Sequence, residues 1–222
     1  MDIGYFLNRR IAFIRQLYIT ATHEYVERQQ KIEAEEAPFV PPYSEDGEPP
    51  FLEEWLEADD SLQVLGRACV SMLAATLKLY FKAWEREVGI PVDDSLRSEF
   101  GRGFVNGYRA YFLHHFGIRF EDAPVNVAIL EEIVLARNNI EHPESITSSH
   151  SHYSDSDLKK LAHPFFVDDR EKSLLIEIGE SQNSWLMPPT IHVTSDKLLN
   201  ALAEIERFTN WLEQVEISHD AK

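Results

Sequence analysis

The segment from about residue 60 to residue 88 constrains the fold most strongly, because apolar side chains recur in it every three or four residues. One stripe is made of Leu62, Leu65, Cys69, Met72, Thr76, Leu79 and Ala83. A second stripe, made of Val70, Leu73, Leu77, Tyr80 and Trp84, widens the first. This spacing predicts an α-helix, and an apolar surface around so much of its circumference predicts a central place in a bundle. Asp59, Asp60 and Ser61 are candidate N-caps, and Gly89 and Pro91 end the pattern.

Other segments show the same helical spacing. They cover residues 2–35, 93–116, 124–142 and 195–215. Pro124 suits the first turn of one of these helices, Pro143 stops it, and Ser195 is a candidate cap for the last. The sequence therefore predicts a mainly α chain built as an up-and-down helical bundle, with residues 1–222 forming a single domain.

Two non-helical regions interrupt this bundle. Residues 36–58 are acidic and rich in proline, which predicts a surface loop. Within residues 165–194, the stretches "KSLLIEIG" and "TIHV" resemble short strands. We therefore expect a small β-hairpin elaboration before the C-terminal helix.

Composition narrows the class of protein. The net charge of −17 argues against a nonspecific nucleic-acid coat protein, whose affinity comes from neutralising phosphates. The charge is uneven, because the segment 97–119 contains four arginines against Glu99 alone. One cysteine, Cys69, suits a reducing compartment and a buried position. With neither a leader-like apolar stretch nor a run of 18 apolar residues, we expect a cytoplasmic protein that contacts no membrane.

Strong polar groups gather at the end of the fourth predicted helix, in "LARNNIEHPES". Asn138 and His142 are four residues apart and share a helical face, Glu131 lies near that face, and Arg137 is next to it. Histidine exchanges protons near neutral pH, and a guanidinium binds phosphate through two parallel hydrogen bonds. An amide side chain can orient the imidazole or hold a group of the ligand. A base and a phosphate clamp suffice for cleavage of RNA by its own 2′-hydroxyl, without metal or other cofactor.

The pattern Arg137-Asn138-x-x-x-His142 resembles the Arg-x4–6-His motif of HEPN domains. The resemblance implies a helical bundle that forms a homodimer with two motif copies across one cleft. It also implies a metal-independent endoribonuclease of a toxin–antitoxin or phage-defence system, with an antitoxin as a protein partner. Arg137 would be the phosphate clamp, His142 the general acid and base, and Asn138 the orienting residue. HEPN toxins paired with minimal nucleotidyltransferases often carry a tyrosine where this chain has Glu144, which sets it apart from that subgroup.

Several alternatives stay open beside this interpretation. The alternative for Arg137, Asn138 and His142 is a helix C-terminal cap, because the helix dipole favours cations there. Arg109 and His114 repeat the motif spacing, though Ala110 follows that arginine. The second interpretation of the chain is a non-catalytic HEPN-like dimerisation or partner-binding module, and the third is a helical scaffold in which the motif is coincidental.

Two further groups of residues complete the candidates. Arg102 and Arg109 share a helical face and would steer RNA, with Tyr108 or Tyr111 stacking on bases unless those rings belong to the core. Glu131 fits a salt-bridge partner better than a catalyst. The paired histidines of "SHSHYSD" fit a solvated loop better than a metal site.

Overall fold

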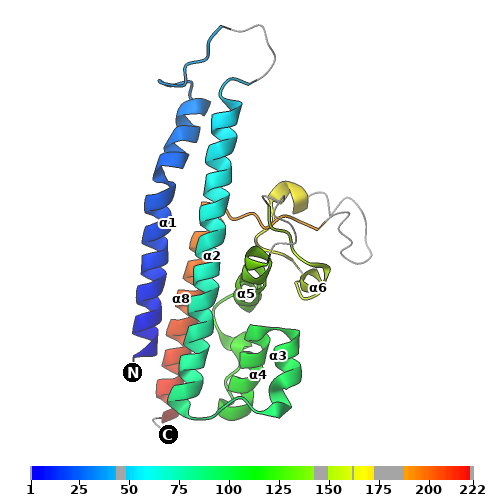
Figure 1. Cartoon of the computed structure of the whole chain (residues 1–222). Helices are drawn as coiled ribbons and strands as arrows, with labels where there is room; N and C mark the ends of the chain where they lie inside the picture. The colour runs from blue at the N-terminus through cyan, green and yellow to red at the C-terminus, as the bar shows by residue number, and fades with distance from the viewer. Residues whose placement is uncertain (1, 44–48, 143–149, 162, 173–187, 221–222) are drawn as a thin grey trace.

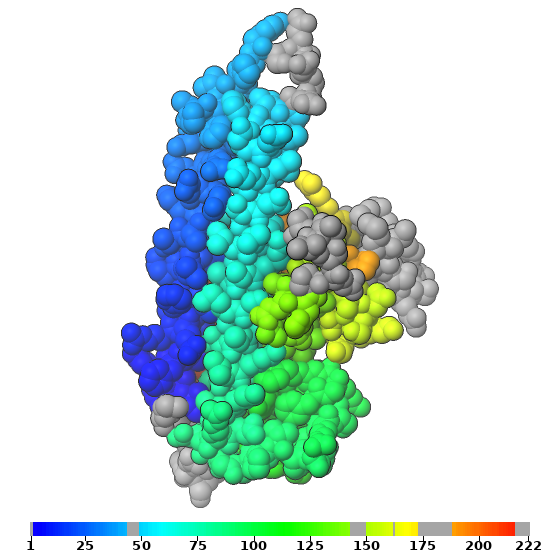
Figure 2. Space-filling model, viewed as in Figure 1, coloured from blue at the N-terminus to red at the C-terminus, as the bar shows by residue number. Residues whose placement is uncertain are grey.

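The computed structural model describes residues 2–43, 49–142, 150–161, 163–172 and 188–220. Two long helices dominate it: α1 (Ile3–Glu33) and α2 (Leu52–Val88), which pack side by side along their lengths (Figure 1). The C-terminal helix α8 (Ser195–Asp220) packs against both. Both ends of the chain lie at the same end of this bundle, and the far end of the α1–α2 pair projects beyond the rest of the molecule (Figure 2).

α2 begins at Leu52, earlier than the predicted cap at Asp59–Ser61. The extra turns are held by α1, because Trp55 Nε1 donates to Glu33 Oε1 at 3.0 Å and Arg28 pairs with Glu57 at 3.2 Å. Ser61 donates to the Glu57 carbonyl within the helix instead of capping it. The true helix start depends on a neighbouring helix, so local cap signals placed it too late.

The segment predicted as one helix over residues 93–116 is broken in the structure. A 3-10 turn, η1 (Asp94–Leu96), leads into the short α3 (Arg97–Arg102), and α4 (Phe104–Phe116) follows after Gly103. The break is made by the carboxylate of Glu131, which lies against Gly103. A Cβ atom at Gly103 would lie only 2.5 Å from the carboxyl carbon of Glu131. Glycine permits this close approach, which a periodicity pattern does not reveal.

α5 (Val127–Glu141) carries the motif and lies on the other side of α2 from α1 (Figure 1). It starts after Pro124, at an N-cap made by Asn126, whose side chain accepts from Ala128 N at 3.1 Å. α8 likewise receives its first-turn hydrogen bond at Thr194 Oγ1, from Lys197 N, and not at the predicted Ser195. Both helices agree with the predicted ranges to within a few residues.

The region before α8 is irregular in the described residues. It contains the short α6 (Asp155–Leu158) and two isolated β-bridges, His152 with Thr190 and Val167 with Ile191. The "TIHV" stretch supplies one partner of each bridge, and no regular strand forms in the part of the chain that the structure describes. The "KSLLIEIG" stretch falls outside that part except for Lys172, so the hairpin stays a prediction.

The core lies where α2, α4, α5 and α8 meet. Phe81 of α2 is fully buried at its centre, stacking on Tyr108 at 4.7 Å and meeting Phe120 and Phe208 at 6.1 and 5.9 Å. Cys69 is buried as predicted, and burial raises the pKa of its thiol to about 11. α2 is long and apolar enough to cross a membrane, but 56% of its most apolar window is buried inside the fold, as in a core helix. The predicted mainly α class and the central place of α2 are confirmed.

Candidate functional site

Arg137 lies on the last full turn of α5, with 29% of its side chain exposed. Its guanidinium pairs with the carboxylate of Glu141, four residues along the same face, and donates to Asn138 Oδ1 at 3.2 Å. The cation is therefore held at the surface and reaches solvent. A negatively charged ligand would have to compete with the Glu141 carboxylate for the guanidinium of Arg137.

His142 is the residue at which α5 ends. Its φ of −125° and ψ of 63° take the chain out of the helix, and the residue is exposed. It makes no hydrogen bond or ion pair with another described residue. Among the described residues Asn138 and His142 form no hydrogen bond with each other, and Asn138 Oδ1 accepts from Arg137. Pro143 and Glu144 lie outside the described residues.

Asn139, which we did not single out in the sequence, makes the long-range contacts of this turn. Its Nδ2 donates to Asp157 Oδ2 at 2.8 Å, and its Oδ1 accepts from Ser154 N at 3.2 Å. These bonds tie the end of α5 to the cap of α6. Asn139 therefore has a structural role, whereas Asn138 accepts a hydrogen bond from Arg137.

Lys78 of α2 is a second residue that sequence reasoning missed. Its ammonium lies over the Phe104 ring at 5.6 Å. Burial lowers the pKa of Lys78, and the nearby charge of Arg137 lowers it further, whereas Glu141 opposes this. In the sequence Lys78 stands between Leu77 and Leu79 and interrupts an apolar pattern. That interruption could have marked Lys78 as a candidate functional residue. A second helix thus brings one further cation near the arginine of the motif.

The carboxylates earlier in α5 belong to the scaffold. Glu131 is buried and accepts from the backbone nitrogens of Phe104 and Asn106, each at 3.0 Å. It therefore caps α4 and is not the salt-bridge partner we expected. Burial raises its pKa, although the backbone hydrogen bonds act in the opposite direction.

Glu132 is buried more completely than Glu131. It accepts from Tyr153 Oη at 2.6 Å, from Phe165 N at 2.7 Å and from Phe166 N at 2.8 Å. Burial raises its pKa as well. This single carboxylate fixes the segment before α8 onto α5.

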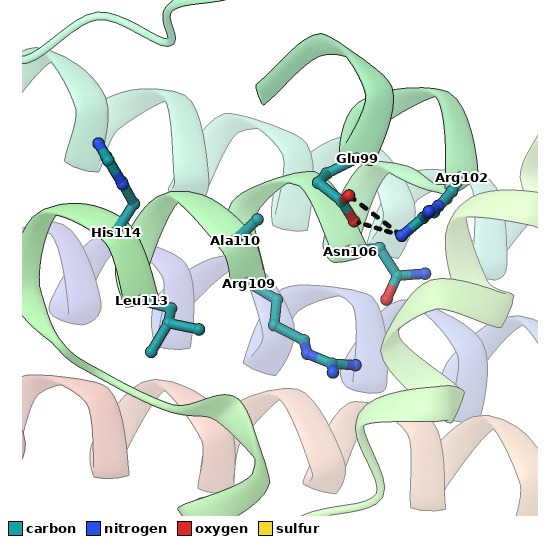
Figure 3. Close-up of a pocket in the computed structure, with 7 residues that line it drawn as sticks. All are labelled: Glu99, Arg102, Asn106, Arg109, Ala110, Leu113 and His114. Atoms are coloured by element: carbon teal, nitrogen blue, oxygen red, sulfur yellow. Dashed lines mark hydrogen bonds and ion pairs between the residues drawn. The ribbon is translucent and has the colours of Figure 1, made fainter. Parts of the chain in front are cut away.

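Arg102 and Arg109 line a separate surface pocket of about 520 Å³ along α3 and α4 (Figure 3). Arg102 pairs with Glu99 at 3.0 Å, and Arg109 pairs with Glu121 at 2.7 Å. Arg102 and Asn106 stand at one end of the pocket and His114 at the other (Figure 3). The residues lining it do not include Arg137, Asn138 or His142. The structure thus keeps the two groups of predicted site residues in different places.

The tyrosines beside this pocket are core residues. Tyr108 and Tyr111 are both buried, and their hydroxyls donate to Glu85 Oε2 at 2.9 Å and to the Ile90 carbonyl at 2.7 Å. Neither ring presents a face to solvent, so of the two alternatives for these rings the core position is confirmed and base stacking is excluded. The polar lining of the pocket is made by Glu99, His114, Asn106 and the two arginines.

The paired histidines of "SHSHYSD" are placed by the irregular segment. His152 takes part in a β-bridge with Thr190, and its Nδ1 lies 3.1 Å from the Pro188 carbonyl oxygen. No metal-ligating group of three side chains includes them among the described residues. At the end of α5, the predicted site residues that reach solvent are therefore the partly exposed Arg137 and the exposed His142, and the charge of Lys78 acts on Arg137. Comparison of the chain with protein-family models, with curated protein sequences and with solved structures found no match.

Proposed function

We propose that this chain is a HEPN-like, metal-independent endoribonuclease that cleaves single-stranded RNA, as a toxin or phage-defence component. The observation that carries the proposal is an exposed imidazole, His142, following one turn after a surface guanidinium, Arg137. The proposal includes the architecture implied by the same resemblance: a cytoplasmic homodimer, with a β-hairpin before α8.

The chemistry follows from the roles of the two side chains. His142 takes the proton of a ribose 2′-hydroxyl, and the resulting oxygen attacks the adjacent phosphorus. The bond from phosphorus to the 5′ oxygen breaks, and that oxygen takes up a proton, which leaves a 2′,3′-cyclic phosphate and a 5′-hydroxyl. Arg137 stabilises the negative charge on the phosphate as it grows. DNA lacks the 2′-hydroxyl and would be spared.

Lys78 and Glu141 would set how readily RNA enters. Lys78 adds a second cation beside Arg137 on an otherwise acidic chain, which raises the local attraction for phosphate. The Arg137–Glu141 pair is partly exposed, and such pairs contribute at most about 0.5 kcal/mol to stability. A phosphate can therefore replace Glu141 at low cost. Arg102 and Arg109 would act farther away, by steering RNA through a second surface.

The test uses tag-free protein, single-stranded RNA and EDTA. We expect wild-type protein to yield cyclic-phosphate ends, and Arg137→Ala and His142→Ala each to lose about 100-fold or more in rate. Lys78→Ala should weaken RNA binding with a smaller effect on the chemical step. Arg9→Ala and His23→Ala serve as matched controls, because both residues are exposed on α1, on the other side of α2.

Two results would overturn the assignment. Cleavage that EDTA abolishes would show a metal-dependent enzyme. Cleavage that survives loss of His142 but depends on Arg109 and His114 would move the site to the other Arg-x4-His match, in the pocket of α4.

A second candidate is a non-catalytic dimerisation module, favoured by a groove of about 290 Å³ between α1 and α2. Phe6 and Leu79 line it, each 52% exposed, and Arg10 and Arg86 lie in the same lining. Exposed apolar side chains in a groove mark a contact surface, and the arginines suit an acidic partner such as a second copy of this chain.

Pairing through this groove would leave the two α5 helices apart, because α2 separates α1 from α5 (Figure 1). Light scattering after size-exclusion chromatography distinguishes the two candidates. Leu79→Glu should give a monomer if the groove is the interface, whereas Val64→Glu, an equally exposed position of α2 outside the groove lining, should not.

A further inference from the structure

Two neighbouring histidines at the end of α4 meet an aspartate from another segment. Asp93 lies in the turn between α2 and η1, and His114 and His115 belong to the last turn of α4. One possible ligand atom from each of the three side chains lies within 4.8 Å of the other two. The rings of His114 and His115 are 4.7 Å apart and nearly perpendicular. Residues separated by about 20 positions in the chain are thus brought to one point.

The carboxylate of this cluster is already oriented. Asp93 Oδ1 accepts from the Ser95 backbone nitrogen at 2.7 Å and from the Ser95 hydroxyl, which leaves Oδ2 for a ligand. These hydrogen bonds lower the pKa of Asp93, and His114 adds to the effect. Outer hydrogen bonds of this kind hold a metal-binding carboxylate in place.

The histidine side of the cluster is also fixed. The His115 ring lies 4.7 Å from the Tyr111 ring, and Tyr111 in turn donates to the Ile90 carbonyl, three residues before Asp93. Tyr111 therefore links α4 to the turn that carries the aspartate. His115 Nε2 is shielded from solvent and forms no hydrogen bond within the described residues, and in the tautomer with the proton on Nδ1 it offers a lone pair to a ligand.

We propose that Asp93, His114 and His115 form a three-ligand site for a borderline divalent cation of the zinc, cobalt and nickel class. Two imidazoles and one carboxylate are the ligand types that such ions prefer, whereas magnesium and calcium favour oxygen ligands alone. Ligand atoms around a tetrahedral zinc ion lie roughly 3.4 Å apart, given bonds of about 2.0–2.1 Å. The exposed side chains of Asp93 and His114 can close the remaining distance by small rotations. Water would complete the coordination, because these two ligands face solvent.

The bound cation would join the turn after α2 to the end of α4. It would sit at the C-terminal end of a helix, where the dipole favours positive charge. This role is independent of Arg137 and His142, and of the three ligands only His114 also lines the pocket of Arg102 and Arg109. Because the ion binds the folded chain, its effect would appear as a rise in thermal stability that depends on metal concentration.

The test is a titration of tag-free protein, stripped of metal, with ZnCl2, followed by calorimetry and by the imidazole NMR signals of His114 and His115. We expect one tight equivalent that shifts both sets of signals and raises the melting temperature. His114→Ala should weaken this binding by at least about tenfold, the loss typical even of outer-shell changes. Asp93→Asn should weaken it too, while its amide oxygen still accepts from Ser95. His23→Ala, which removes an exposed imidazole from α1, should bind as the wild type does.

Each contrary result is specific. Equal zinc affinity in wild type, His114→Ala and Asp93→Asn would overturn the proposal, as would zinc binding that His150→Ala or His152→Ala removes. Equal binding of MgCl2 and ZnCl2 would overturn the class of cation. Circular dichroism of each variant separates lost binding from lost folding.

Discussion

The two halves of α5 use polar residues in opposite ways. Glu131 and Glu132 are buried, and each satisfies donors from other segments of the chain. One to three turns later, Arg137 pairs within its own helix and with no other described segment, and His142 is exposed. Both halves would be noted in a sequence as charged residues on an apolar helix. The difference indicates that the carboxylates build the fold, and it predicts that the motif residues contribute little to stability.

The largest expected effect on stability comes from Glu132→Ala. It would leave the Tyr153 hydroxyl and the backbone nitrogens of Phe165 and Phe166 buried without an acceptor. Each such donor costs about 1–3 kcal/mol, so we expect a loss of about 3–5 kcal/mol in the free energy of unfolding. Urea denaturation followed by circular dichroism measures it. A loss below about 1 kcal/mol would break the contrast between the two halves of the helix.

Glu131→Ala should cost less, because its acceptor role resembles an N-cap. Removal of a helix cap costs about 0.5–2 kcal/mol, and burial places this case at the upper end. Gly103→Ala tests the same contact from the other side, since its Cβ would meet the Glu131 carboxylate. Urea unfolding of both variants and of the double variant checks the coupling. Strictly additive losses would contradict a shared contact.

The pH dependence of stability also distinguishes the buried carboxylates of α5 from its exposed residues. Burial raises the pKa of Glu132 above the ordinary 4.5, so the folded state holds this proton more tightly than the unfolded state. Its contribution to stability is then greatest below pH 4.5 and decreases as pH rises through the window above that value.

Glu132→Gln lacks this titration, and its side-chain oxygen still accepts hydrogen bonds. Wild type should therefore gain stability over Glu132→Gln as pH falls from about 7 toward about 5. Glu141→Gln, at an exposed glutamate of the same helix, is the matched control for general charge effects. A difference between wild type and Glu132→Gln that does not change with pH would refute the burial argument.

The same contrast explains what the sequence could reveal. Regular spacing of apolar residues placed α1, α5 and α8 within a few residues, because that pattern is set by each helix alone. The start of α2 at Leu52 and the break at Gly103 depend on Trp55 and on Glu131, which act between segments far apart in the chain. Spacing in the chain cannot report such contacts.

The residues of the candidate site also fall into two groups, those that local sequence spacing could predict and those placed by contacts between distant segments. The sequence placed Arg137 near the end of its helix because helical spacing and Pro143 are local signals. The structure also has Arg137 in the last turns of α5. Lys78 comes from another helix, and the donors to Glu132 lie 21 to 34 residues beyond it, so neither could be read from local spacing. Within α5, residues whose partners are remote form the scaffold, and residues whose partners are local form the candidate site.

The smallest expected effects on stability come from the motif itself. Arg137→Ala removes a partly exposed pair with Glu141 and a hydrogen bond to Asn138, both within α5, and His142→Ala removes a side chain with no partner among the described residues. Surface changes of this kind stay within about 0.5 kcal/mol, so both variants should unfold at nearly the urea concentration of the wild type. RNA cleavage by the same samples should nevertheless fall by about 100-fold or more. A loss of stability above about 2 kcal/mol in either variant would make these residues part of the scaffold. Unchanged stability together with lost cleavage would instead establish that α5 is divided between building the fold and acting on RNA.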